Sequence, residues 1–169
     1  MTHEITEYLA NDHDRLDGLL KQVITPSGEI NTSVYHQFRQ GLLRHIGIEE
    51  KILIPALQSK LDDTTKQTVE RIRMDHSAIV ALLVPPPSSG ILTALKSILT
   101  QHNELEEAHG GFYERADLAD TGSTQPLVER VKNFPDVKSL PNNSDPKVFE
   151  ATRRALERAG YAPEKYLPV

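Results

Sequence analysis

The stretch HIGIEE at residues 45–50 returns as HNELEE at residues 102–107. In both copies a histidine is followed four residues later by a glutamate, and a second glutamate comes next. On an α-helix, positions i and i+4 lie on one face, about 6 Å apart. Each stretch therefore predicts a helix that presents an imidazole and a carboxylate side by side.

An Asp-His pair precedes each of these stretches. Asp12-His13 comes before the first stretch, and Asp75-His76 comes before the second. The repeated order of the two motifs indicates a duplicated helix pair with pseudo-twofold symmetry. Such a bundle places two equivalent metal positions across its axis. Each position takes two histidines, and the two glutamates lie between the metals.

Apolar residues recur at helical spacing in four segments of the chain. We expect helices over residues 2–23, 32–60, 65–84 and 91–116. Short loops separate them, and no segment sustains the alternation that is typical of a strand. The sequence therefore predicts an all-α fold, an up-down-up-down four-helix bundle. Pro55 lies inside the second segment, where its missing N–H is expected to kink the helix or end its straight part.

The tail of the chain differs from the rest in composition, because it is rich in proline and asparagine. We expect residues 1–120 to form the bundle, with a turn at 121–124, and residues 121–169 to form a C-terminal extension. One helix is predicted over residues 146–159, since Asp145 is a good helix start and Gly160 a good stop. Three residues are expected to pin it onto the bundle or onto a second subunit of a homodimer: Phe149, Leu156 and Tyr161.

One histidine interrupts the apolar stripe of each predicted helix, and two helices add a glutamate: His13, His45, Glu49, His76, His102 and Glu106. A single histidine on an apolar stripe is more often a satisfied core residue than a ligand. Here each of the four predicted helices has a histidine on its apolar stripe. In addition, two unpaired buried carboxylates would cost several kcal/mol each. Two metal cations would offset that charge. Imidazole and carboxylate donors suit iron, manganese or zinc rather than calcium.

Several polar residues lie close in sequence to these six predicted ligands. Glu106 and His109 have the Glu-x-x-His spacing of ferritin-like sites, so His109 is either a fifth histidine ligand or a residue that lines the core. Tyr113, one turn further, is expected to lie beside the ligands without binding metal. Four acidic residues are expected to cap, face solvent or reach a neighbouring helix, with the glutamates as alternative ligands: Asp12, Glu50, Asp75 and Glu107.

The composition excludes several classes of function. The net charge is −5, and no basic block is present to bind nucleic acid. The N-terminus has neither the apolar stretch of a signal peptide nor one that could span a membrane, so we expect a cytoplasmic protein. Cysteine is absent, which excludes disulfides and iron–sulfur ligation. No flavin or nicotinamide motif is recognisable, so any redox activity needs an external electron donor.

The two Asp-His pairs and the stretches at 45–50 and 102–107, the first continuing into Ile54-Pro55-Ala56-Leu57, are similar to those of the hemerythrin-like (HHE cation-binding) family. The resemblance spans about residues 5–117. It implies two non-haem irons bridged by an oxo or hydroxo group. It also implies that His13 and His45 bind one iron, that His76 and His102 bind the other, and that Glu49 and Glu106 bridge them.

The sequence departs from the oxygen-carrying hemerythrins at two positions. Those proteins have a further histidine where this sequence has Ile72, and an aspartate in place of Glu106. The ligand set is closer to that of the bacterial members that repair iron–sulfur clusters or reduce nitric oxide. Those members add a cysteine-bearing N-terminal domain, whereas this sequence has no cysteine.

Four functions are compatible with this pattern. The first is a di-iron protein that binds or reduces O2, NO or H2O2, because the predicted ligands leave open positions on each metal. The second is an iron or oxygen sensor without turnover. The third is a ferritin-like iron handler, which is disfavoured because Glu106-His109 is the one Glu-x-x-His in the predicted helices. The fourth is a metal-free bundle that acts through its surface. Zinc or manganese are substitutes for iron in the isolated protein.

Overall fold

The computed structural model describes residues 3–58, 62–119 and 126–167. The predicted helix ends at Thr2 and Lys60, the turn at 121–124 and the boundary between bundle and extension lie outside the described residues. Within them the regular elements are α1 Glu4–Val23, α2 Thr32–Ile48, the π-helical turn η1 Glu49–Leu53, α3 Ile54–Leu57, α4 Asp63–Leu82, α5 Ser89–Glu107, α6 Phe112–Ala119, α7 Leu127–Lys132, α8 Pro146–Arg158 and the 3₁₀ turn η3 Pro163–Lys165.

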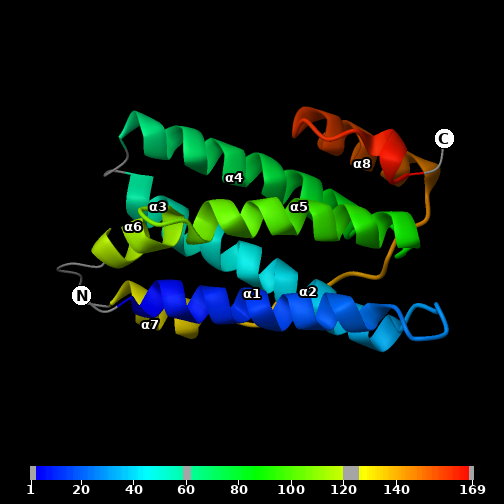
Figure 1. Ribbon diagram of the computed structural model, residues 1–169, viewed down its shortest axis with the longest axis horizontal. Helices are drawn as coiled ribbons and strands as arrows, with labels where there is room; N and C mark the ends of the chain where they lie inside the picture. Colours follow the sequence, from blue (N-terminus) through cyan, green and yellow to red (C-terminus); the bar gives the residue numbers. More distant parts are fainter. Residues whose placement is uncertain (1–2, 59–61, 120–125, 168–169) are drawn as a thin grey trace.

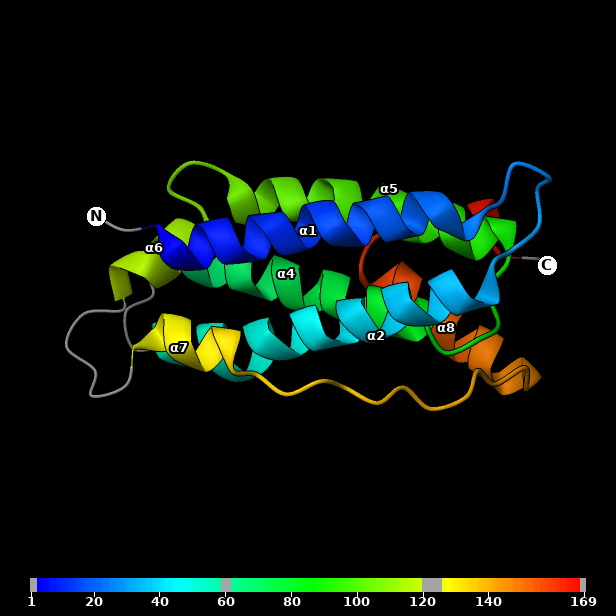
Figure 2. The same ribbon diagram turned by 90° about the horizontal axis from the view of Figure 1, so that it is seen from below.

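The described chain is helical and contains no strand, apart from an isolated bridge between Ile24 and Ile30 in the loop after α1. The long helices α1, α2, α4 and α5 lie side by side along the long axis of the molecule (Figures 1 and 2). Helix α1 contacts α2 and α5, and α4 contacts α5. The all-α prediction is therefore confirmed. No described helix is both long enough and apolar enough to cross a membrane.

Polar side chains fix where three of the long helices begin. The side chains of Asn31, Asp62 and Ser88 accept hydrogen bonds from the backbone N–H groups three residues later, at the starts of α2, α4 and α5. Such caps satisfy donors that have no partner within the helix. The helix starts are thus set locally, and the inward face of each helix follows from its apolar spacing.

The core of the bundle consists of two apolar clusters with a polar layer between them. One cluster contains Leu16, Phe38, Leu82 and Leu95, and the other contains Leu9, Leu53, Ile72 and Phe112. Each long helix has a buried histidine at or next to the point where its residues pass from one cluster to the other. The fold therefore gathers four histidines at one level of the bundle.

The second predicted helix does not continue through Pro55 as a single kinked helix. It passes from α2 into η1, where the N–H of Ile54 donates to the carbonyl of Glu49, five residues earlier. Pro55 lies in the first turn of α3, where its missing N–H costs little. Single π-turns of this kind are frequent at functional sites. This one begins at Glu49.

The prediction of one continuous helix over residues 91–116 is wrong in one respect. Helix α5 ends at Glu107, and the chain becomes helical again at Phe112 as α6. Gly110 has φ +71°, a conformation that residues with a side chain rarely adopt. A Cβ atom on Gly111 would lie 2.5 Å from the carbonyl oxygen of Ala108. The Gly-Gly pair thus ends α5 and separates α6 from it.

The C-terminal segment packs along the bundle. Helix α8 lies against α4, and the chain between α7 and α8 runs past α2 (Figure 2). The guanidinium of Arg39 donates to the carbonyl of Leu140, and that of Arg44 donates to the carbonyl of Phe134 at 2.7 Å. These contacts join the segment to α2 at two points.

We expect Gly90→Ala to destabilise the protein, because a Cβ atom at Gly90 would lie 1.9 Å from the backbone oxygen of Tyr166. Overpacking of this kind costs about 1–3 kcal/mol. The matched control is Gly18→Ala on α1, where nothing lies within 4 Å of the added Cβ and a gain of about 1 kcal/mol is expected. Thermal unfolding of both variants measures the difference. Equal stabilisation would contradict the packing of the C-terminal segment on α5.

Candidate metal centre

Six ligand-type side chains from the long helices meet in the polar layer: His13, His45, Glu49, His76, His102 and Glu106. Each is 5% exposed or less. They are the six residues that the sequence predicts. They face inward because each continues the apolar stripe of its helix at a spacing of three or four residues.

The six residues form two quartets that share both glutamates. The first quartet is His13, His45, Glu49 and Glu106, and the second is Glu49, His76, His102 and Glu106. In each quartet one ligand atom from every residue lies within 4.8 Å of the others. Such groups have the size and donor types that can hold a metal ion.

Each glutamate divides its two oxygens between the quartets. Glu49 Oε1 lies 3.3 Å from His45 Nε2, and Glu49 Oε2 lies 3.0 Å from His76 Nε2. Glu106 Oε2 lies 3.4 Å from His13 Nε2, and Glu106 Oε1 lies 3.1 Å from His102 Nε2. This is the arrangement of two carboxylates that bridge a pair of cations.

Four further carboxylates hold the outer nitrogens of the histidines, and we call them the outer carboxylates: Asp12, Glu50, Asp75 and Glu107. The Nδ1 atoms of His45, His76, His102 and His13 lie 2.9, 2.8, 3.5 and 2.5 Å from them, in that order. For His13, His45 and His76 this pairing is a hydrogen bond, which fixes the tautomer and the ring orientation. His102 Nδ1 faces Asp75 without a hydrogen bond. Of the roles predicted for these four acids, the geometry supports contact with a neighbouring helix.

The charges in this layer shift the ionisation of its members. Burial opposes protonation of His45 and His102, but the facing carboxylates outweigh it and raise the pKa of each imidazole to about 10. Burial would raise the pKa of Glu49, yet His45 and His76 hold it well below its usual range. Without a cation the layer therefore balances its carboxylates with protonated histidines. A metal that binds must displace those protons.

The second quartet contains buried polar atoms without a hydrogen-bond partner. They are Glu49 Oε2, His76 Nε2 and Glu106 Oε1. An unsatisfied buried polar group costs about 1–3 kcal/mol, and more when it is charged. A cation coordinated by these atoms would satisfy all three, so the residues fit a bound metal.

The comparison with protein families matches this site. A model of the Hemerythrin HHE cation binding domain matches residues 4–116, which include all six ligand-type residues. The chain belongs to this family. The comparisons with curated proteins and with solved structures found no match.

His109 takes no part in the centre of this hemerythrin domain. It lies in the break between α5 and α6, and its side chain is 99% exposed and faces Glu114 at 3.2 Å. The spacing argument placed it inward because it assumed that the helix continues beyond Glu107. His36 is also exposed, on the outer face of α2.

Tyr113, by contrast, reaches the first quartet from α6. Its hydroxyl lies 3.0 Å from His13 Nε2 and 3.1 Å from His45 Nε2. It also lies 2.6 Å from Glu49 Oε1 and 3.0 Å from Glu106 Oε2. Burial, with the charges of both glutamates, raises the pKa of Tyr113 well above its usual value, so the phenol keeps its proton.

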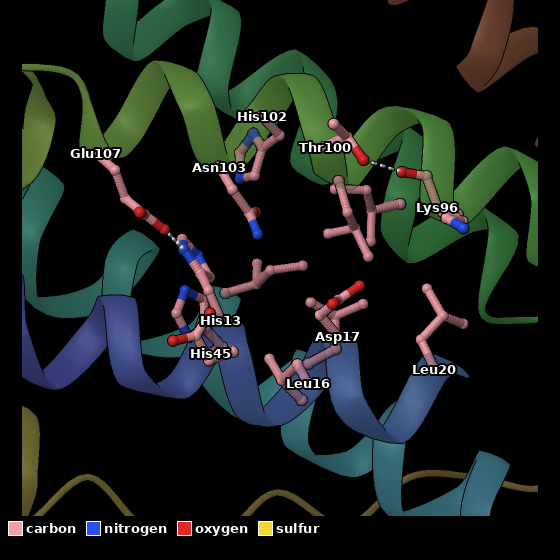
Figure 3. A pocket seen from close by; sticks show the side chains of 15 residues that line it. His13, Leu16, Asp17, Leu20, His45, Lys96, Thr100, His102, Asn103 and Glu107 are labelled. Carbon is pink, nitrogen blue, oxygen red and sulfur yellow. Dashed lines mark hydrogen bonds and ion pairs between the residues drawn. The ribbon is translucent and has the colours of Figure 1, made fainter. Parts of the chain in front are cut away.

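A pocket of about 240 Å³ leads to the centre between α1 and α5. Three histidines, His13, His45 and His102, lie at one end of it, and Lys96 and Leu20 lie at the other (Figure 3). Its walls include apolar side chains: Leu16, Leu42, Ile79 and Leu99. This pocket cannot be predicted from the sequence, because it depends on how two helices are spaced.

The C-terminal segment also touches the centre through an outer carboxylate. The hydroxyl of Tyr161 donates to Asp75 Oδ1 at 2.7 Å, while Asp75 Oδ2 faces His102. Arg71 donates to the same aspartate, to the Tyr161 hydroxyl and to the carbonyl of Ala159. One carboxylate thus joins the residues after α8 to a ligand-type histidine.

We expect Glu107→Ala to lower the metal affinity of the domain about 10–100-fold, the usual effect of losing a carboxylate that orients a histidine ligand. Its Oε1 is the partner of His13 Nδ1. Competition with a chelator measures the change. The matched control is Glu104→Ala, an exposed glutamate on the same helix. Equal affinities in the two variants would show that Glu107 does not orient a ligand.

Proposed function

We propose that this chain is a non-haem di-iron protein that binds O2, NO or H2O2, or reduces one of them with electrons from an external donor. The observation that carries the proposal is the division of Glu49 and Glu106 between the quartets, one oxygen to each. In the proposed centre His13 and His45 hold one iron, His76 and His102 hold the other, and the glutamates and an oxo or hydroxo group bridge them. Zinc and manganese accept the same donors.

A bound iron pair would supply redox chemistry and open positions for a small ligand. The four histidines and two glutamates supply four protein donors at each quartet, fewer than the six of an octahedral ion. The outer carboxylates keep the Nε2 atoms of His13, His45 and His76 aimed at the centre. Among the residues that the structure describes, no separate acid–base pair or nucleophile lies in the layer, which argues against hydrolysis of an organic substrate.

The pocket supports a small ligand. It has a volume of about 240 Å³, and leucine and isoleucine side chains line it beside three of the histidines. Polar and charged side chains also line it, among them Asp17, Lys96 and Asn103. A pocket of this size admits diatomic molecules and peroxide. The proposal takes residues 1–120 as the metal-binding bundle, with its long helices in up-down-up-down order, and residues 121–169 as the extension.

A second candidate is an iron or oxygen sensor, and one observation favours it. Asp75 joins His102 to Tyr161 of the extension. A change of charge or position at His102 on metal binding would therefore alter the contacts that hold the residues after α8. Such a link is what a sensor needs between its site and a second surface.

The first test is elemental analysis with ultraviolet–visible spectra of the reduced and oxidised protein. We expect about two irons per chain, and an oxo-bridge absorption that changes with O2, NO or peroxide. His45→Ala and His102→Ala should each lower the metal content, because each removes a ligand of one quartet. The control His36→Ala removes an exposed histidine and should retain both irons. Equal metal content in all three variants would refute the ligand assignment.

The sensor candidate makes a separate prediction. Hydrogen exchange of α8 should differ between the metal-free and the iron-loaded protein, while reduction of O2, NO and peroxide stays negligible. Tyr161→Phe, which removes the hydroxyl that contacts Asp75, should abolish the difference. Unchanged exchange in α8 on metal loading would exclude signalling through this contact.

A further inference from the structure

We propose that the Tyr113 hydroxyl oxygen is a direct ligand of the metal in the first quartet, so that the two metal positions are unequal. This inference rests on the proposed function, because it assumes a cation in the first quartet. It adds a ligand that the repeated motifs do not contain. The evidence is the position of the Tyr113 hydroxyl oxygen relative to the four donor atoms of the first quartet.

The Tyr113 oxygen lies where the four donor atoms of the first quartet converge. Its distances to them are between 2.6 and 3.1 Å. A hydroxyl donates one hydrogen bond and accepts two, so it cannot satisfy four polar neighbours. Two of the four are carboxylate oxygens, which can only accept, and the phenol has one proton for both. A cation among these atoms would turn the crowded contacts into coordination.

The second quartet has no such group. Its atoms Glu49 Oε2, His76 Nε2 and Glu106 Oε1 lack a hydrogen-bond partner among the described residues. The internal repeat explains the difference, since Tyr113 follows Glu106 by seven residues and Ala56 follows Glu49 by seven. An alanine offers no donor atom. The half of the chain that contains Ala56 therefore has no counterpart of the phenol.

The break between α5 and α6 brings the phenol to the quartet. In an unbroken helix, seven residues would separate Tyr113 from Glu106 by about 10.5 Å along the axis. The turn at Gly110 and Gly111 interrupts that rise, and the Tyr113 hydroxyl meets Glu106 Oε2 at 3.0 Å. The ring is fully buried, and it packs on Phe112 with 5.8 Å between ring centroids. The hydroxyl therefore cannot turn to solvent without unpacking α6.

Coordination by Tyr113 would make the two metal positions different. The first quartet has five protein ligands, and the second has four. The second position keeps more free sites for a small ligand. The pocket is lined by histidines of both quartets, His13 and His45 of the first and His102 of the second. On coordination the phenol loses its proton to solvent, the oxygen–metal bond forms, and no electron is transferred.

The test is resonance Raman and visible absorption of the full chain loaded with ferric iron. We expect a phenolate-to-iron charge-transfer band with tyrosinate vibrations in the wild type. Both should vanish in Tyr113→Phe, which keeps the ring and removes the oxygen. The matched control is Tyr35→Phe, a buried tyrosine whose hydroxyl contacts none of the six ligand-type residues, and it should keep both signals.

Each outcome separates this inference from the proposed function. Two irons with an oxo-bridge band but no tyrosinate vibrations in the wild type would overturn the inference and leave the di-iron proposal standing. Tyrosinate vibrations that persist in Tyr113→Phe would also overturn it. A chain that binds no iron would refute both. If Tyr113→Phe does not fold, ring-deuterated tyrosine in the wild type shows whether any tyrosinate is bound, because only a coordinated tyrosinate gives isotope-shifted bands in resonance with that absorption. Absence of those bands would overturn the inference. Their presence would support Tyr113, because its hydroxyl lies within 3.1 Å of donor atoms of the first quartet.

Discussion

The closed ring of carboxylate–imidazole pairs is the interaction on which the rest of the structure depends. Asp12 of α1 holds His45 of α2, and Glu50 of η1 holds His76 of α4. Asp75 of α4 then holds His102 of α5, and Glu107 of α5 holds His13 of α1. Every long helix is thus tied to the next by a charged pair at one level. Burial makes these pairs costly to break, since loss of one partner leaves an uncompensated charge.

The six ligand-type residues could be predicted from the sequence because helical periodicity is a local property. A residue three or four positions from two core leucines faces the core, whatever the neighbouring helices do. His109 shows the limit of that reasoning, since its inward position required α5 to continue. The Gly110-Gly111 pair was the available sign of a break. The domain division at residue 120 stays a prediction.

The outer carboxylates and the pocket could not be assigned in the same way. Asp12 precedes His13 in sequence, yet it serves His45, because adjacent residues diverge by about 100° on a helix. Which histidine an aspartate reaches depends on the distance and rotation of the next helix. The contact between Tyr161 and Asp75 depends on how the C-terminal segment packs, and neither residue indicates it alone.

Both halves of the repeat become irregular at or just after the glutamate that faces both quartets, and they do so differently. After Glu49 the chain keeps helical hydrogen bonding through a π-turn and enters α3 at Ile54. After Glu106 it breaks at a Gly-Gly pair and returns as α6. The duplication accounts for two quartets of equal composition. Because the two halves end differently, a phenol lies beside one quartet among the described residues. A symmetric set of ligand-type residues is therefore compatible with two unequal candidate metal positions.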